Sequence, residues 1–144
     1  MSNIKIAVGS DHGGLEYKEK ILEFLKNKGY ETIDEGTYSK ESCDYPEFAR
    51  KVANLVAEKK ADRGILICGS GIGMSIAANK VKGIRAALCS ETTSARLSRE
   101  HNNSNILCLG QRLIGETMAF EIVETWLNTE FAGGRHQHRI DIIE

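Results

Sequence analysis

Residues 64–75 read GILICGSGIGMS, an apolar run that ends at Cys68 and is followed by glycines alternating with small or apolar residues. A short apolar run bounded by glycine is typical of a buried strand in a parallel sheet, and the glycines after it predict a turn that opens a helix. In such a turn the backbone N–H groups can converge on an anion, aided by the positive end of the helix dipole. We therefore expect a parallel α/β fold with a ligand site where this strand ends.

Working outward from Gly64–Cys68, four more segments have the character of strands: Ile4–Val8, Glu31–Asp34, Arg85–Cys89 and Ile106–Leu109. Segments of helical character lie between and after them: Leu15–Lys28 with Gly29 as its stop, Phe48 to Val56 with Pro46 at its start, Thr92–Glu100, and Met118 to Leu127. This alternation predicts one domain over residues 1–144, a three-layer Rossmann-like α/β sandwich with a five-stranded parallel sheet.

The composition of the 144 residues, 41% hydrophobic and 27% charged, fits one globular domain. Lys and Arg number 19 against 20 Asp and Glu, which argues against nucleic acid or an anionic membrane as a partner. No apolar run reaches the ~18 residues of a spanning helix and no signal-peptide pattern precedes Ile4, so we expect a cytoplasmic protein. The four cysteines form no CxxC pair and have no zinc-type spacing, so reduced thiols and no metal site are expected.

Ligands of open α/β sheets bind at the carboxyl ends of the strands. The first strand is followed by residues 9–14, GSDHGG, which do not match the GxGxxG dinucleotide fingerprint, although Asp34 has the spacing of a ribose-binding acid. Asp11 and His12 in this segment are either functional groups or a cap of the following helix.

Cys68 directly precedes the glycines of the third strand–helix turn. The positive helix end would favour its thiolate as a base or nucleophile, and no Walker lysine follows to bind a nucleoside triphosphate. The alternative is a buried structural cysteine in a tight turn.

Two arginines near the end of the chain, Arg135 and Arg139, are four residues apart and share a face if the segment is helical. Two guanidinium groups on one face suit a phosphate, and Arg112 after the fifth strand could bind the same phosphate. Surface salt bridges are the competing interpretation of the pair. His101 precedes the last strand, where a lone histidine is more often structural.

These segments together resemble the type B ribose-5-phosphate isomerase family, whose wider group includes the galactose-6-phosphate isomerase subunits. The matching motifs run through almost the whole chain: SDHGG at 10–14, DYP at 44–46, ICGSGIG at 67–73, IAANK at 76–80, GIRA at 83–86, SREHN at 98–102 and GGRHQ at 133–137. In the branch that the chain resembles, a cysteine at the position of Cys68 is the base. Another branch uses a glutamate at the position of Ser75.

The resemblance implies aldose–ketose isomerisation of D-ribose 5-phosphate and D-ribulose 5-phosphate through ring opening and a cis-enediolate, without metal or cofactor. His101, helped by Asp11, would open the ring, and Cys68 would then move the proton between C2 and C1. The enediolate would be stabilised by the turn of Gly69, Ser70, Gly71, Ile72 and Gly73. The phosphate would be bound by His12, Arg112, Arg135 and Arg139. Tyr45 and Asn102 would contact sugar hydroxyls.

Members of this family are homodimers or tetramers with active sites shared between subunits, so the same is expected here. One alternative is the same reaction on a six-carbon phosphate, such as allose or galactose 6-phosphate. Another is a non-catalytic phosphosugar-binding module, although phosphate binding alone requires none of Cys68, His101 and Asp11. A flavodoxin-like or nucleotide-binding domain is disfavoured by the missing glycine fingerprint.

Overall fold

The computed structural model describes residues 4–144, in which five strands form one parallel sheet in the order β2-β1-β3-β5-β4. The strands are β1 (Lys5–Ser10), β2 (Glu31–Asp34), β3 (Arg63–Cys68), β4 (Ala86–Leu88) and β5 (Ile106–Gly110). The helices are η1 (His12–Gly14), α1 (Leu15–Asn27), α2 (Tyr45–Ala57), α3 (Ile72–Ala78), α4 (Thr92–Glu100), α5 (Glu116–Asn128) and α6 (Arg135–Ile143). The predicted three-layer α/β fold is confirmed. The first three residues of the domain predicted over residues 1–144 lie outside this description.

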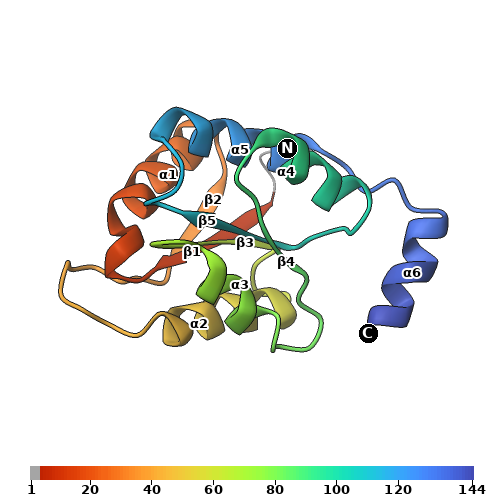
Figure 1. Cartoon of the computed structure of the whole chain (residues 1–144), viewed down its shortest axis with the longest axis horizontal. Helices are drawn as coiled ribbons and strands as arrows, with labels where there is room; N and C mark the ends of the chain where they lie inside the picture. The colour runs from red at the N-terminus through yellow and green to blue at the C-terminus, as the bar shows by residue number, and fades with distance from the viewer. Residues whose placement is uncertain (1–3) are drawn as a thin grey trace.

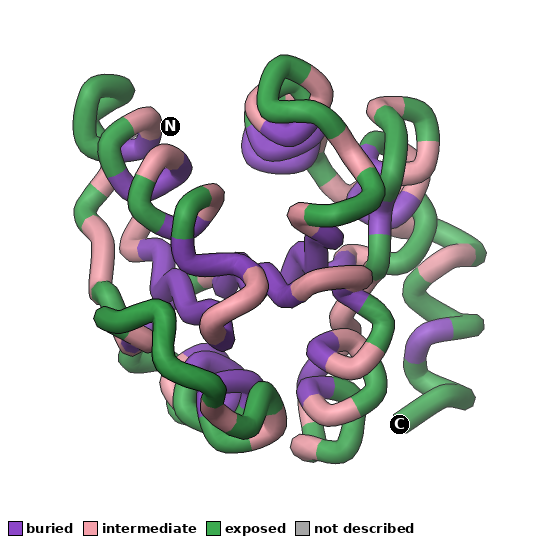
Figure 2. The backbone as a smooth tube through the Cα atoms, turned by 60° about the vertical axis from the view of Figure 1, so that its left-hand side comes forward, coloured by how far each residue is buried: buried purple, intermediate pink, exposed green. Residues whose placement is uncertain are grey.

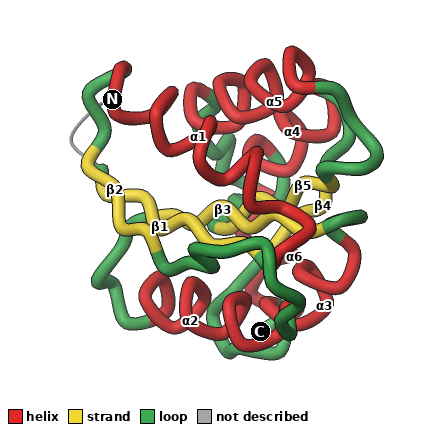
Figure 3. Tube along the Cα trace, turned by 90° about the vertical axis from the view of Figure 1, so that its left-hand side faces the viewer, coloured by secondary structure: helices red, strands yellow, loops and turns green. Residues whose placement is uncertain are grey.

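Helices cover both faces of the sheet, with α1, α4 and α5 on one side and α2 and α3 on the other (Figures 1 and 3). Each face has its own apolar core, one around Trp126 and Leu25 and the other around Val52 and Met74. The central strands are buried on both sides, as the purple segments in the middle of Figure 2 show. Within residues 4–144, no helix has both the length and the hydropathy to cross a membrane.

Four predicted strands differ from the structure at their ends. β3 begins one residue earlier than predicted, β5 ends one residue later, and β1 and β4 differ at both ends. β1 continues past Val8 to Ser10, because Ser10 still pairs with Ile67 of β3 and its N–H donates to the Gly36 carbonyl at 2.7 Å. β4 is shorter than predicted, since Arg85 leaves the sheet to donate its N–H to Asn105 Oδ1 at 2.8 Å. β1 therefore delivers the residues that follow it directly beside the end of β3.

The sheet has its topological switch point between β1 and β3, because the chain leaves β1 toward β2 on one side while β3 lies on the other. Ligands of doubly wound sheets bind in the crevice at this point. Asp11 donates its N–H to the Ile67 carbonyl at 3.3 Å, and a Cβ on Gly14 would overlap that same carbonyl. Glycine at position 14 thus allows the turn after β1 to approach the turn after β3.

Candidate active site

A cavity of about 540 Å³ opens at this switch point. Its lining residues come from the segments that follow β1, β3 and β5, from the start of α2 and from α3: Asp11, Tyr45, Cys68, Gly69, Ser70, Ile72, Gly73, Ile76, Arg112 and Leu113. Most of the site residues predicted from the sequence are therefore brought together. Ile76 and Leu113 were not predicted, although Ile76 follows Ile72 by one helical turn and so shares its face.

The thiol of Cys68 lies at the floor of this cavity and is only 5% exposed. The Gly71 N–H points at its sulfur, with 3.1 Å between Gly71 N and Cys68 Sγ. Gly71 adopts φ +78°, and a side chain there would collide with the Leu109 backbone at 2.9 Å. The turn after β3 therefore directs one backbone donor at the Cys68 sulfur.

The environments of Cys89 and Cys108 differ from that of Cys68. Both thiols are buried in the core, where burial raises the pKa of each. Their sulfurs therefore stay protonated at neutral pH and pack as small apolar groups. Cys43 is partly exposed and lies beside His12, with 3.9 Å between its sulfur and His12 Nδ1.

Asp11 both caps a turn and faces the cavity, so the two interpretations of this residue are compatible. Its Oδ1 accepts the Gly13 N–H at 2.9 Å, which caps η1, and its side chain also lines the cavity. A second cavity of about 720 Å³ shares Asp11 and Tyr45 with the first and adds His12. The Cys43 N–H donates to His12 Nδ1 at 3.2 Å, so a neutral ring carries its proton on Nε2, which can donate to an anion.

Arg112 and Tyr45 each lie against a glycine of the turn after β3. Arg112 donates its N–H to the Gly69 carbonyl at 2.9 Å, and a Cβ on Gly69 would come 3.4 Å from the Arg112 side chain. The Tyr45 ring lies over Gly73, where a Cβ would approach it to 2.6 Å. Glycine at position 73 therefore makes room for the Tyr45 ring, whereas a Cβ at position 69 would make ordinary van der Waals contact with Arg112.

The remaining predicted site residues, His101, Asn102, Arg135 and Arg139, do not line this cavity. His101 follows α4, and residues 101–105 form the turn that leads into β5. That turn is bound to the beginning of β3, because the Gly64 N–H donates to the Asn105 carbonyl at 2.9 Å. At ~3.3 Å per residue, Cys68 lies about 13 Å further along β3, at the carboxyl end of the strand, whereas the turn lies at its amino end.

α6 is attached to this turn rather than to the cavity, and it stands beyond the loop that enters β5 at the right of Figure 1. The rings of His101 and His136 stack with 4.3 Å between their centroids and 13° between their planes. Desolvation, together with the charges of His101 and the α6 arginines, lowers the pKa of His136. The segment that carries Arg135 and Arg139 is helical, which is the condition under which the two side chains share a face. We call residues 101–105 together with α6 the arm.

Asp34, which has the spacing of a ribose-binding acid, is engaged within the fold. Its Oδ1 accepts from the Lys18 ammonium at 2.6 Å, and Lys18 is 1% exposed. A buried ammonium requires a counterion, so this carboxylate has a structural partner. Across residues 4–144, no group of three or more His, Cys, Asp or Glu side chains is placed to hold a metal ion.

Known proteins resemble this chain along nearly its whole length. The sequence model of the ribose/galactose isomerase family matches residues 6–143. Escherichia coli ribose-5-phosphate isomerase B is 52% identical over 139 residues, covering 96% of this chain and 93% of that protein. The structure of Clostridium thermocellum ribose-5-phosphate isomerase B superimposes with a TM-score of 0.97 at 57% identity, covering 97% of this chain and 95% of that one.

A second solved structure carries a ligand. Ribose-5-phosphate isomerase B from Mycoplasma genitalium, with bound ribulose-5-phosphate, has a TM-score of 0.96 at 44% identity and covers 99% of this chain and 95% of that one. The fold, the cavity at the switch point and these matches define an isomerase of phosphorylated sugars. The chain belongs to the ribose/galactose isomerase family.

Proposed function

We propose that the chain interconverts D-ribose 5-phosphate and D-ribulose 5-phosphate, with Cys68 as the base. The observation that carries the proposal is the position of the Cys68 sulfur, which lies at the cavity of the switch point and faces the Gly71 N–H. The five-carbon substrate is favoured by the names of the relatives and by the ribulose 5-phosphate bound to the Mycoplasma genitalium enzyme.

In the proposed reaction the Cys68 thiolate removes the proton from C2 of the open-chain aldose. The C2–H electron pair forms the C1–C2 double bond, and the aldehyde oxygen takes up the negative charge of a cis-enediolate. The thiol then returns the proton to C1 while the C2 oxygen becomes the ketone carbonyl and its proton passes to O1. The turn residues Gly69, Ser70, Ile72 and Gly73 line this cavity. One backbone N–H or hydroxyl directed at the developing charge typically contributes about a hundredfold or more to the rate.

We also propose that the active sites are shared between two copies of the chain. In a single chain Cys68 lies at the carboxyl ends of the strands and His101 lies at their amino ends, so His101 does not reach the cavity of its own chain. The rim of that cavity exposes apolar side chains, with Ile76 58% and Leu113 66% exposed. An apolar rim is typical of a surface that a partner covers. In a two-fold dimer each arm would enter the partner's cavity reciprocally.

The phosphate would then be bound from both chains. His12 and Arg112 come from the chain that supplies Cys68, while Arg135 and Arg139 come from α6 of the other. Tyr45 of the first chain and Asn102 of the second would contact the sugar hydroxyls. A homodimer is the smallest assembly that satisfies this arrangement, and a tetramer of two such dimers satisfies it equally.

An isomerase assay without added cofactor tests the reaction. We expect turnover of ribose 5-phosphate and a lower kcat/KM for allose and galactose 6-phosphates. A higher kcat/KM for a six-carbon phosphate would identify that phosphate as the preferred substrate and leave the proposed chemistry unchanged. Phosphosugar binding without turnover would instead indicate a binding module.

His101→Ala is expected to impair ring opening more than proton transfer. Isomerisation of ribose 5-phosphate, which is mainly cyclic, should fall about a hundredfold, the scale of one general acid–base group. Ribulose 5-phosphate cannot close a furanose ring, because its O5 carries the phosphate. Its exchange of the C1 hydrogen with deuterated solvent, followed by NMR, should therefore fall much less. An equal loss in both measurements would assign His101 to proton transfer instead.

Arg135→Ala and Arg139→Ala are each expected to raise KM by about 10-fold or more, because each removes a charge-assisted contact of ~1.5–3 kcal/mol with the phosphate. Steady-state kinetics with ribose 5-phosphate measures the effect. His138→Ala is the matched control, since His138 is exposed on the same helix and has no proposed contact. An unchanged KM in both arginine variants would locate the phosphate elsewhere.

A further inference from the structure

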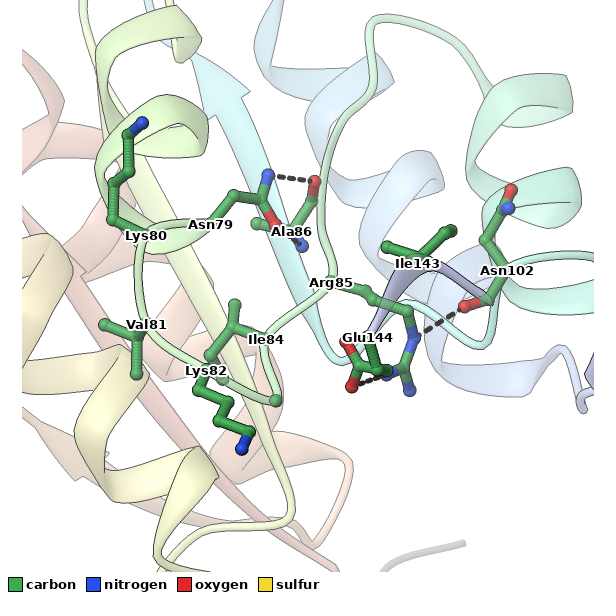
Figure 4. Close-up of a pocket in the computed structure, with 11 residues that line it drawn as sticks. Asn79, Lys80, Val81, Lys82, Ile84, Arg85, Ala86, Asn102, Ile143 and Glu144 are labelled. Atoms are coloured by element: carbon green, nitrogen blue, oxygen red, sulfur yellow. Dashed lines mark hydrogen bonds and ion pairs between the residues drawn. The ribbon is translucent and has the colours of Figure 1, made fainter. Parts of the chain in front are cut away.

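Arg85 belongs to the GIRA segment and has no part in the proposed chemistry, yet its side chain lies between the two halves of the arm. Nε donates to the Asn102 carbonyl at 2.9 Å and an Nη donates to the Asn103 carbonyl at 3.0 Å. Its other Nη lies 3.6 Å from a carboxylate oxygen of Glu144, just after the end of α6. Figure 4 shows the guanidinium between Asn102 and Glu144, beside a cavity of about 620 Å³.

The backbone of Arg85 binds the same turn. The Arg85 carbonyl accepts the Asn105 N–H at 3.0 Å, and the Arg85 N–H donates to Asn105 Oδ1 at 2.8 Å. Within the turn Asn103 has φ +47°, a conformation that a residue other than glycine adopts at a cost. The turn therefore depends on contacts from outside itself, and several of them come from Arg85.

Arg99 binds the same turn from its other side, so two arginines contact residues 103–105. Its guanidinium donates to the Ser104 carbonyl at 2.6 Å and to Asn103 Oδ1 at 2.9 Å. Burial lowers the pKa of Arg99 to about 10, which still leaves it a cation at neutral pH. The remaining hydrogen bond described for Arg99 goes to the Thr129 carbonyl, just after α5, whereas Arg85 contacts both the turn and the residue that follows α6.

We propose that Arg85 is a positioning residue for isomerisation, one that holds the His101–Asn102 turn and α6 in a fixed relative position. This inference rests on the proposed function, because it assigns the turn to ring opening and the α6 arginines to phosphate binding. Both groups must reach the partner's cavity together for one substrate to contact both. A planar guanidinium suits this task, since its N–H groups point in several fixed directions at once, whereas a lysine ammonium is a point charge.

Arg85→Gln tests the proposal, with Arg96→Gln as the matched control. Arg96 is an exposed arginine on α4 whose only described partner is Glu100, so its loss removes the same charge without touching the turn. We expect Arg85→Gln to lower kcat about 10-fold and to raise KM several-fold for ribose 5-phosphate, the range of one or two charge-assisted hydrogen bonds. The control should keep both values near those of the wild type.

Two further variants separate the contacts of Arg85. Arg85→Lys keeps a charge near Glu144 but loses the fork to the two carbonyls, so kcat should stay low while KM recovers toward the wild type. Glu144→Gln weakens only the ion pair to α6, so it should raise KM slightly and leave kcat unchanged. Full recovery of kcat in Arg85→Lys would overturn the role assigned to the carbonyl contacts.

Amide hydrogen exchange provides a readout that does not depend on turnover. Exchange at residues 103–105 should become faster in Arg85→Gln and stay unchanged in Arg96→Gln, with equal melting temperatures. Faster exchange with wild-type kcat and KM would make Arg85 a purely structural residue and overturn the proposal. Absence of ribose 5-phosphate turnover in the wild type would contradict the proposed function itself, and the exchange data would still report whether Arg85 fixes the arm.

Discussion

Cys68→Ala is expected to abolish isomerisation while leaving sugar-phosphate binding nearly intact. The thiolate acts only in proton transfer, and a general base of this kind contributes about 10²–10⁴-fold to the rate. The phosphate is bound by groups elsewhere in the proposed site, so Kd should change little. Turnover by a coupled assay and ribose 5-phosphate binding by calorimetry measure the two quantities on the same preparation.

The other cysteines provide the controls for this variant. Cys89 and Cys108 have thiols that burial keeps protonated, so Cys89→Ala and Cys108→Ala should retain turnover and lose only some stability. Cys43→Ser is the more demanding control, because Cys43 lies beside His12 at the edge of the neighbouring cavity. A comparable loss of rate in any of these variants would show that the wrong thiol has been identified as the base.

The sequence predicts the layers of the fold because four of the five strands are nearly continuous apolar runs, whereas Glu31–Asp34 is not such a run. β2 has the predicted bounds residue for residue, and so has α4. The ends of β1 and β4 were less predictable because they depend on tertiary contacts. Ser10 stays in the sheet through Gly36, and Arg85 leaves it through Asn105, and neither partner is near in sequence.

The half of the site that follows β1 and β3 was predictable for a topological reason. Residues after parallel strands share one edge of the sheet, so Asp11 and Cys68 meet without any information about side-chain packing. Ile76 and Leu113 lie at the rim because the core leaves these two apolar side chains exposed. Composition alone does not predict which apolar side chains stay exposed. The positioning role proposed for Arg85 gave no signal either, since its two guanidinium hydrogen bonds go to backbone carbonyls, which every sequence carries, and its ion-pair partner Glu144 is distant in sequence.

His101 and Asn102 could be assigned to the site only by resemblance, because they precede a strand instead of following one. The end of a helix that leads into a strand lies at the amino edge of a parallel sheet, which is where His101 is found. This same rule places His101 far from Cys68 within a chain and makes a second chain necessary for the proposed mechanism. The consequence can be measured by mixing inactive subunits.

Cys68→Ala and His101→Ala homodimers should each be nearly inactive, and mixing them should restore activity. In a mixed dimer with shared sites, one site carries both lesions and the other carries neither. Random exchange of equal amounts makes half of the dimers mixed, so about one quarter of wild-type activity should return. Mass spectrometry of the mixture verifies that mixed dimers have formed.

The control pairs two lesions from the same edge of the sheet. Asp11 and Cys68 line one cavity of one chain, so every site of a Cys68→Ala and Asp11→Asn mixed dimer keeps one lesion and no activity should return. Recovery in the first mixture and none in the second would place His101 and Cys68 of each site on different chains. If instead mixed dimers form in the first mixture and remain inactive, each chain must supply its own histidine, and the arm would have to cross the length of β3 to do so.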